Sequence, residues 1–599
     1  MSFHPNDVVR RARAATFVVS GVGVYLAGAF FRTQILHHDE WVLQSEDNRL
    51  RQVPIPAPRG TIVDRTGAVI AENAVSYSVS MLVKNETELR ETMSRLNELI
   101  PLSKKSVDDA VRRYRRDTAR PTAILPDASF DQVAVLEEHR LDYPSLIIQT
   151  APKRVYPLGR AVGAFVGYTS EISESQLAAR ADSGYRGGQQ IGNTGLEESY
   201  ESLLRGHEGS RFVEVDAMNR VMREEGARAD LRAVPGKELK TNIDLDLQLF
   251  IYNLFGDSLI GGAVALDPKS GSVLAIHTAP SIDPNRFIGG VASSYYDSLR
   301  TDKRRPLYNK ALQGLYAPGS TFKLATSVLA LESGVATLKD HMPQSCNGSY
   351  FFGNRVWHCW EPAGHGSLDL AGAIKHSCDV FFYQLGLKLT LARFSAGGVD
   401  LGFGQRTGID LPSEKRPQWP DPGYLDNKYG KGKWIAVGGP GTFESLNLAI
   451  GQGSNSQTIL NMARFYTALA TDGSEPDSIR IAQRPNKRVK VIDLTQDQLV
   501  QLRTAMEGVT EVGGTAASAA LQGVAIAGKT GTAQSGTFVA GKEQNHAWFA
   551  GIAPSQDAKI VVVVMIEFGG HGTRAARIAS AIIGHYLHVK SVWNLGDQG

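Results

Sequence analysis

The sequence predicts an α+β protein with a single membrane helix near its start. Three observations predict this: one uncharged run close to the N-terminus, strand-like patterns at both ends of residues 240–590, and helical patterns rich in Ala and Leu between them. Of the 599 residues, 42% are apolar and 21% are charged, which is enough apolar surface to build cores. The formal net charge of +3 supplies no strongly basic face, so we expect no nucleic-acid partner.

The membrane helix is predicted from the uncharged run AATFVVSGVGVYLAGAFF between Arg13 and Arg32. As a helix this run is about 27 Å long, against a hydrocarbon core of roughly 30 Å. Arginines precede the run, and the positive-inside bias puts that end in the cytoplasm. We therefore expect a cytoplasmic tail at 1–13, an anchor at 14–34 and a large external body. A cleaved signal peptide is the alternative, because Ala27–Ala29 has a small-x-small pattern.

The composition shifts near Pro235 and Gly236, which predicts a first external domain at 40–236 and a second at 240–590. In the first, QVPIPAP at 52–58 indicates an extended linker. SYSVSMLV alternates like a strand, and 86–143 is charged and helical in pattern. An arginine run within 112–120 is typical of a solvated helix face, and the functional alternative is a docking surface for a partner or for anionic lipid.

In the second domain, TNIDLDLQLFIYNLF predicts a helix with Asp244 near its start. GGAVALD and GSVLAIH, joined by the turn DPKSG, predict a hairpin of buried strands. The remaining elements that we expect are helices at 321–333, 368–390 and 457–471, and strands at 524–533 and 559–567.

The sharpest chemical signal is PGSTFK, which holds Ser320 and Lys323. In a helix that starts at Ser320, these two residues lie on one face. A serine hydroxyl is a weak nucleophile and needs a base beside it. A lysine can be that base where burial or a neighbouring cation lowers its pKa. The structural alternative is a helix N-cap followed by a surface lysine.

Two later segments add to this pattern. Ser377 and Asp379 stand in KHSCDVFF, and Lys529 stands in IAGKTGTAQ after an apolar run. Lys529 supplies a cation that can meet a substrate carboxylate. Gly531 leaves room for a substrate backbone along an edge strand. A Ser-x-x-Lys, a Ser-x-Asn type and a Lys-Thr-Gly motif in this order are typical of serine enzymes that react with β-lactams.

On these motifs the sequence resembles the class B penicillin-binding proteins, the peptidoglycan D,D-transpeptidases of the bacterial envelope. PRGTIVDRTG, RVYPLG and GLEESYE resemble the family's non-catalytic pedestal, and LYAPGSTFK and LNLAIGQG resemble its transpeptidase domain. The resemblance implies an elongated, mostly β or mixed pedestal over 40–236. It also implies a penicillin-binding domain over 240–590, with a central antiparallel sheet flanked by helices. Asp379, where division-specific enzymes usually carry Asn, resembles the elongation type, penicillin-binding protein 2.

The resemblance implies a two-step acyl transfer on a peptidoglycan stem pentapeptide. Ser320, deprotonated by Lys323, attacks the D-Ala-D-Ala carbonyl, and the terminal D-Ala leaves with a proton passed through Ser377. An amine of a neighbouring strand then resolves the acyl-enzyme, and β-lactams trap Ser320. Asp379 and Lys529 complete the catalytic set, and the substrate-binding residues are Thr530, Gly531 and Thr532.

The resemblance also implies an inner-membrane protein with its catalytic domain in the periplasm, docked onto a polytopic glycosyltransferase. Three alternatives stay open at this point. One is a division-specific transpeptidase, and another is a scaffold that activates a glycan polymerase. The third is a β-lactam sensor or hydrolase, for which a pedestal of this size is excess. The rate at which bound penicillin is released separates the last alternative from a transpeptidase.

The three cysteines fall within 33 residues and have His365 among them. Three thiolates and one imidazole would complete a closed tetrahedral zinc site of the structural kind, with Cys346, Cys359, His365 and Cys378 as ligands. The alternative is a Cys346–Cys359 disulfide with a buried Cys378 thiol, since disulfides form in external compartments. A helical 377–379 would point Cys378 away from the cleft. The resembling subfamily includes zinc-binding members with carboxylates where Cys346 and Cys359 stand.

Overall fold

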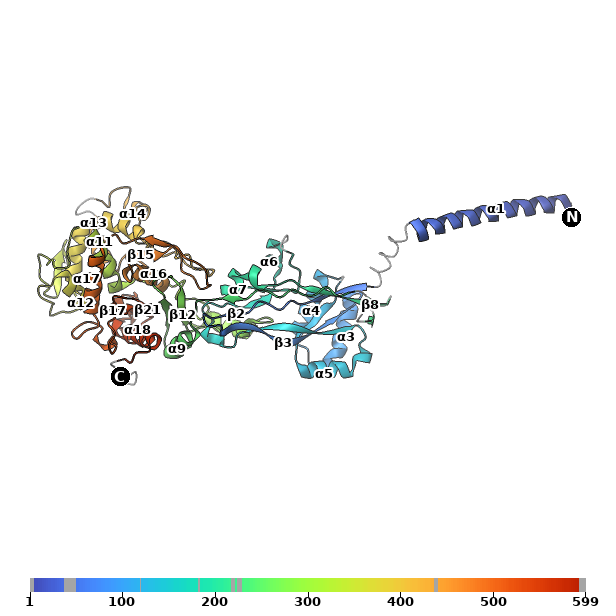
Figure 1. Cartoon of the computed structure of the whole chain (residues 1–599), viewed down its shortest axis with the longest axis horizontal. Coiled ribbons are helices and arrows are strands. Elements are labelled where there is room, and N and C mark those ends of the chain that lie inside the picture. The colour runs from blue at the N-terminus through green and yellow to red at the C-terminus, as the bar shows by residue number, and fades with distance from the viewer. Residues whose placement is uncertain are drawn as a thin grey trace.

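The computed structural model describes residues 5–36, 50–118, 120–180, 184–216, 221–223, 229–435 and 440–591. Figure 1 shows an elongated first domain and a broader second domain that lie in line. The first domain is the predicted pedestal, and the second carries the three catalytic motifs. The fold class predicted from the sequence, α+β with an antiparallel catalytic sheet, is confirmed.

The N-terminal helix α1 runs from Pro5 to Phe31 and continues as a π-helical turn, η1, over Arg32–Leu36. Among the described residues, Val8–Leu36 is the one stretch of helix long and apolar enough to cross a membrane. None of its most apolar window is buried against the rest of the protein, and Phe17 is 84% exposed. Such a surface requires an apolar environment, which a bilayer supplies.

The pedestal is built around strand β3 (Val69–Met81). Strand β3 pairs with β5 (Leu146–Val155) over Glu72–Met81, with β2 (Ile62–Val63) near its start and with β4 (Thr122–Ala128) near its end. The short strand β10 (Leu239–Lys240) pairs with β2 and leads into the second domain. Strand β4 corrects the prediction for 86–143, because this segment is not helical throughout.

A second pedestal sheet has the order β1-β8-β9, formed by Leu50–Ile55, Gly209–Val215 and Val221–Arg223. Strand β1 corrects the prediction of an extended linker at 52–58. Its Pro54 lacks an N–H group, and β1 tolerates it because β1 lies at the edge of this sheet. The pairing partner, β8, lies more than 150 residues away in the sequence, so local pattern could not reveal the strand.

Three helices cover the membrane-side end of the pedestal: α3 (Glu86–Leu99), α4 (Lys104–Arg116) and α5 (Phe130–Glu138). Their apolar faces share one core with β3 and β4. The arginine run lies on and just after α4 and forms ion pairs. Arg113 contacts Glu171 at 2.6 Å, and Arg115 contacts Glu86 at 2.7 Å. The exposed Arg115 agrees with the interpretation as a solvated helix face, whereas the side chain of Arg113 is only 13% exposed.

The catalytic domain contains a five-stranded sheet of order β12-β11-β21-β20-β17, in which every neighbouring pair is antiparallel. The strands are β11 (Gly261–Leu266), β12 (Val273–Ala279), β17 (Ala527–Ala533), β20 (His546–Ala553) and β21 (Ile560–Ile566). Helices α9 (Leu245–Phe255), α16 (Ile459–Leu469) and α18 (Gly572–Leu587) pack on the sheet. The residues of β21 are buried throughout. The predicted hairpin of buried strands is confirmed, because β11 pairs antiparallel with β12. Strand β17 forms the edge of the sheet beside the catalytic motifs.

Hydrogen bonds at several places join the pedestal to the catalytic domain. The Leu245 N–H, at the start of α9, donates to Asp64 Oδ2 at 3.3 Å. Tyr200 OH donates to Asp410 Oδ2 at 2.6 Å. The predicted helix start near Asp244 is confirmed, because Asp244 caps α9 by accepting a bond from the Leu247 N–H.

Candidate active site

Ser320 lies in a short 3-10 helix, η6 (Gly319–Phe322), and the α-helix α11 (Lys323–Glu332) begins only after it. This corrects the prediction of a helix that starts at Ser320. Gly319 has a φ of +53°, and a Cβ atom there would lie 2.9 Å from Thr532 O. The turn therefore needs glycine at this position and places the nucleophile against strand β17.

Lys323 lies at the centre of the site and is fully buried. Its Nζ donates to Ser377 O at 2.7 Å and to Ser377 Oγ at 3.2 Å, and it forms an ion pair with Asp379 Oδ1 at 2.8 Å. These three oxygens offset the free-energy cost of burying the amino group of Lys323 away from water. Lys323 is thus the group that joins the first and second motifs.

The predicted helix at 368–390 is broken at Ser377. Helix α12 (Leu370–His376) ends there, and α13 (Asp379–Asp400) begins two residues later. Ser377 has left-handed backbone angles, φ 54° and ψ 39°. In a continuous helix, positions i and i+2 point to different faces. The break instead lets both Ser377 and Asp379 reach the same lysine, and it corrects the expectation of a helical 377–379.

Lys529, from strand β17, is the second buried cation of the cleft. Burial holds the pKa of Lys529 well below its usual value, and the charge of Lys323 lowers it further, while Asp379 acts in the opposite direction. Its Nζ donates to Thr530 O at 3.2 Å. Asp379 forms its ion pair with Lys323, so an incoming anion would supply the charge partner that favours the protonated form of Lys529.

Strand β17 approaches the nucleophile turn closely. A Cβ atom at Gly531 would lie 3.0 Å from Pro318 O and 3.0 Å from Thr321 Cγ2. The Thr532 hydroxyl accepts a bond from the Gly572 N–H at 3.3 Å, and the Thr530 and Thr515 hydroxyls lie 2.7 Å apart. The structure thus brings the three motifs together. Among the described residues, no hydrogen bond joins Ser320 Oγ to Lys323 Nζ, so proton transfer between them stays a prediction.

Trp360 belongs to this site and was not anticipated from the sequence. Its backbone N–H donates to Asp379 Oδ2 at 3.0 Å, so it holds the oxygen that Lys323 leaves free. Its indole Nε1–H donates to His376 O at 3.1 Å, and the ring is 54% exposed. Sequence reasoning misses this contact, because it joins residues 19 positions apart and uses a backbone N–H group.

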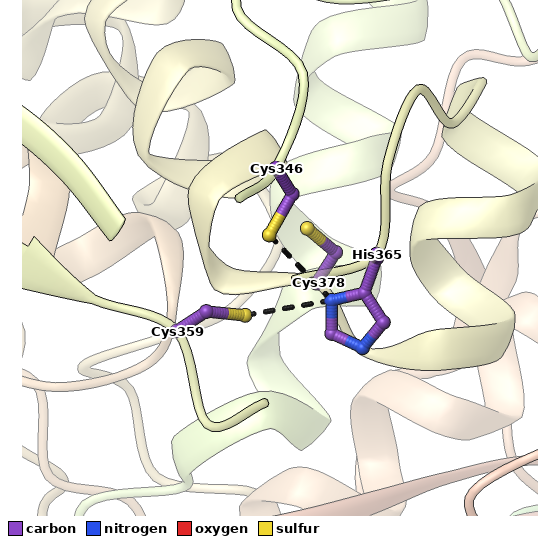
Figure 2. Close-up of side chains that lie close together, drawn as sticks. All are labelled: Cys346, Cys359, His365 and Cys378. Atoms are coloured by element: carbon purple, nitrogen blue, oxygen red, sulfur yellow. Dashed lines mark hydrogen bonds between the residues drawn. The ribbon is translucent and has the colours of Figure 1, made fainter. Parts of the chain in front are cut away.

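The cysteine cluster adjoins the Ser377–Asp379 turn, because Cys378 lies between these two residues, and Figure 2 shows its side chain beside those of Cys346, Cys359 and His365. The ligand atoms of Cys346, Cys359, His365 and Cys378 all lie within 4.8 Å of one another. His365 Nδ1 lies 3.7 Å from Cys346 Sγ and 3.5 Å from Cys359 Sγ. The three cysteines are buried and free, so the predicted alternative of a Cys346–Cys359 disulfide is not what the structure contains.

The donor set fits a tetrahedral zinc ion. With Zn–S of about 2.3 Å and Zn–N of about 2.0 Å, tetrahedral angles place sulfur and nitrogen ligands about 3.5 Å apart. One sulfur–nitrogen distance equals this value, and the other is slightly longer. A hydrogen bond from the Cys378 thiol to the Cys359 sulfur holds the pKa of Cys359 well below that of a free thiol, although burial acts in the opposite direction. The same hydrogen bond, together with burial, raises the pKa of Cys378.

The chain matches two family models. The penicillin-binding protein transpeptidase domain matches residues 261–584, and the penicillin-binding protein dimerisation domain matches residues 54–241. Similar proteins include the peptidoglycan D,D-transpeptidase MrdA of Acinetobacter baumannii, which is 31% identical over 94% of this chain and 85% of its own length. MrdA of Escherichia coli is 29% identical over 97% of this chain and 94% of its own length.

Solved structures agree with this assignment. The penicillin-binding protein PBP2 of Helicobacter pylori in complex with MreC has a TM-score of 0.77 at 25% identity, and the match covers 90% of this chain and 99% of that one. PBP2 of Pseudomonas aeruginosa in complex with WCK 5153 has a TM-score of 0.66 at 27% identity, over 92% and 100% of the two chains. With a transpeptidase domain over more than half of its length and relatives aligned along nearly all of it, this chain belongs to the class B penicillin-binding proteins of the elongation type.

Proposed function

We infer that this chain is a serine D,D-transpeptidase that cross-links peptidoglycan stem peptides during cell elongation, through an acyl-enzyme on Ser320. The observation that carries this function is the single pocket in which Lys323 contacts Ser377 and Asp379, with Lys529 on the neighbouring strand. The names of the relatives, peptidoglycan D,D-transpeptidases, support the same reaction.

In this reaction Lys323 acts in its neutral amine form. It takes the proton of Ser320 Oγ, and the oxygen attacks the carbonyl carbon between the two terminal D-Ala residues. The C–N bond breaks, and the departing amine takes a proton through Ser377, which lies 3.2 Å from Lys323 Nζ. Backbone N–H groups of Ser320 and Thr532 hold the oxyanion. Deacylation reverses these proton transfers when an amine of a second stem peptide attacks the ester.

Substrate orientation comes from β17 in this proposal. Lys529, Thr530 and Thr532 bind the terminal carboxylate, because a cation beside hydroxyl donors suits a carboxylate. Gly531 lets β17 approach the nucleophile turn closely, because a Cβ atom there would lie 3.0 Å from Pro318 O. Asp379 holds Lys323 in place through its 2.8 Å contact, and Trp360 in turn holds Asp379.

Intact-protein mass spectrometry tests the acyl-enzyme. The full chain in detergent is exposed to benzylpenicillin, and we expect one adduct, which peptide mapping places on Ser320. Ser320→Ala forms none. Release of the adduct over hours indicates a transpeptidase, and release within seconds indicates a β-lactam hydrolase. An adduct on another residue contradicts the proposal.

We further propose that the chain is a single-pass protein of the inner membrane, with its N-terminus in the cytoplasm and its catalytic domain in the periplasm. The apolar helix near the N-terminus and the arginines that precede it support this orientation. Solved relatives are described as a complex with MreC and as part of a peptidoglycan synthase complex. On this basis we propose that the pedestal and anchor dock onto a polytopic glycosyltransferase.

We also propose that Cys346, Cys359, His365 and Cys378 bind a structural zinc ion. Four buried or half-buried donors of the types that zinc prefers, with ligand atoms within 4.8 Å of one another, support this site. A bound zinc ion ties the 346–365 loop to the start of α13. Since Trp360 lies in that loop and contacts Asp379, the ion fixes the loop that orients the catalytic lysine. The ion takes no part in the acyl transfer.

Elemental analysis tests the zinc site. The purified full chain should carry one zinc ion per molecule, and a strong chelator should remove it and lower the melting temperature. His365→Ala should lose the metal. His376→Ala is the matched control, because its ring lies 5.9 Å from that of His365 but outside the donor cluster, and this variant should keep the metal. A wild-type chain without zinc after expression in zinc-containing medium overturns the proposal.

A further inference from the structure

A cavity of 530 Å³ lies at the junction of the two domains, apart from the catalytic cleft and from the cysteine cluster. Its pedestal wall comes from helices α7 (Gly195–Ser199) and α8 (Glu201–Leu204). Its catalytic-domain wall comes from residues 409–412 and from Arg480 and Arg484. A cavity of this size accommodates a short peptide.

Two guanidinium groups dominate the charge of this cavity. Arg484 lies over the ring of Tyr200, 5.0 Å from its centroid, and Arg480 Nε donates to the amide oxygen of Asn486 at 2.8 Å. Within the part of the chain that the structure describes, neither arginine forms an ion pair. Guanidinium groups that line a cavity without a carboxylate partner favour an anionic ligand, which they bind in a bidentate manner.

The one carboxylate of the cavity wall, Asp410, offsets only part of the charge of the two arginines. Asp410 Oδ1 accepts a bond from the Ile481 N–H at 2.7 Å, and Oδ2 accepts bonds from the Ala482 N–H at 2.9 Å and from Tyr200 OH at 2.6 Å. Both oxygens of Asp410 are therefore used to hold the walls of the cavity together. The two arginines give the cavity a net positive charge that a ligand can balance.

The remaining wall is mixed in character. Hydroxyl groups of Ser199 and Ser202 stand beside apolar side chains, namely Leu203, Ile409, Leu411 and Pro412. Hydroxyls can bond a peptide backbone, and the apolar side chains can contact small alkyl groups such as the methyl of alanine. Inorganic phosphate would use the arginines alone and leave the apolar wall in water.

We propose that this cavity binds a short peptide with two or more carboxylates, of the kind present in peptidoglycan stems, with one carboxylate at each arginine. The identity of the ligand rests on the proposed function, since a transpeptidase works along a polymer that carries such peptides. A ligand here contacts the pedestal and the catalytic domain together. It also contacts the segment 480–484. Asn242, in the linker between the domains, donates hydrogen bonds to Arg480 O and Ala482 O of this segment. The bound peptide therefore fixes the angle between the pedestal and the catalytic domain.

Calorimetric titration of the full chain tests this site. The probe is the tripeptide L-Ala-γ-D-Glu-meso-diaminopimelate, which lacks the D-Ala-D-Ala group that the catalytic cleft recognises. The protein is first acylated with benzylpenicillin, which blocks the cleft, and the mass shift confirms acylation independently of the titration. If the chain does not acylate, the proposed function fails, and the Ser320→Ala variant still reports whether the cavity binds the tripeptide.

We expect saturable binding that survives acylation and weakens at least tenfold in Arg484→Glu and in Arg480→Gln. Arg577→Glu is the matched control, because Arg577 is exposed on α18 and outside the cavity, and it should bind like the wild type. All three variants should keep the wild-type acylation rate, which shows that they fold. Absence of binding overturns the proposal. So does equal binding of the fully amidated tripeptide, or arginine-dependent binding of inorganic phosphate without binding of the tripeptide.

Discussion

Ser377 meets two requirements at once. Its backbone is left-handed, with a φ of 54°, and its hydroxyl lies 3.2 Å from Lys323 Nζ. A residue with a Cβ atom in this conformation costs about 1 kcal/mol, and glycine does not. The two requirements can be separated by two substitutions, because alanine removes the hydroxyl and keeps the backbone cost, whereas glycine removes both.

We expect both Ser377→Ala and Ser377→Gly to slow acylation of Ser320 by about 10²- to 10⁴-fold, the range for loss of a proton-transfer group. Only the glycine variant should be as stable as the wild type or more stable, by up to about 1 kcal/mol. Stopped-flow acylation with a chromogenic β-lactam and thermal melting measure the two effects. Normal acylation in either variant would remove the proposed role of the Ser377 hydroxyl.

Lys529 is expected to destabilise the free enzyme. Burial, followed by the charge of Lys323, holds its pKa well below that of an exposed lysine. Unfolding below the ordinary lysine pKa of about 10.4 therefore takes up a proton. Stability then rises as the pH rises from the folded-state pKa to about 10.4, since the unfolded chain binds more protons throughout that window.

Lys529→Met should thus raise the free energy of unfolding at pH 8 by about 1–3 kcal/mol, because it replaces a buried amine with an apolar group of similar length. It should also flatten the rise of stability between pH 8 and pH 10. Loss of the amine, which becomes a charged partner when the substrate carboxylate binds beside it, should slow acylation by about ten- to a hundredfold. Thermal melting across pH and acylation kinetics measure these changes. Lys339→Met, at an exposed position, should change neither. A less stable Lys529→Met variant would contradict this account.

At the scale of elements, the close approach of β17 to η6 sets the geometry of the cleft. A Cβ atom at Gly531 would lie 3.0 Å from Pro318 O, which is backbone and cannot move alone. We expect Gly531→Ala to displace the strand by a few tenths of an ångström and to slow acylation at least tenfold, since misplacement by about 1 Å can cost 10²-fold. Gly423→Ala is the control, because its added methyl group makes only an ordinary contact. Equal acylation rates in the two variants would show that the contact is unimportant.

The sequence anticipated the elements whose signals are local. The hairpin β11–β12, the capped start of α9 and strand β21 each have a periodic or capping pattern within a few residues. The break at Ser377 could not be anticipated, because KHSCDVFF carries no glycine or proline, and tertiary contacts with Lys323 stabilise the left-handed residue. Strand β1 was missed because its partner is distant in the sequence.

The same distinction applies to the site. Ser320, Lys323 and Lys529 were found because their motifs carry chemistry in a fixed spacing. The grouping of three cysteines with His365 was predicted from residue types alone, and the structure brings their ligand atoms within 4.8 Å. Trp360 could not be found in this way, because its contact with Asp379 uses a backbone N–H, which every residue except proline carries.

At the scale of the whole molecule, the two domains are tied together next to a buried ionic cluster in the pedestal. Glu197 is fully buried, and its carboxylate accepts bonds from Arg59, from Arg154 Nε at 2.7 Å and from Tyr156 OH at 3.1 Å. Arg59 also contacts Glu201 at 2.6 Å. The cluster joins three pedestal segments that are far apart in the sequence, immediately before α8 and the cavity at the domain junction.

Because Glu197 compensates two buried arginines, we expect Glu197→Gln to lower the free energy of unfolding of the pedestal by about 3–5 kcal/mol, the range for a buried ion pair that loses one partner. Ser320 and its partners lie in the other domain, so acylation by soluble benzylpenicillin at a temperature well below melting should stay within about twofold of the wild type. Differential scanning calorimetry and acylation kinetics measure the two quantities. Glu208→Gln, an exposed change of the same charge, should leave both unaltered. A large loss of acylation in Glu197→Gln without a change in melting would show instead that the cluster acts on the catalytic site, and that pedestal and cleft respond as one unit.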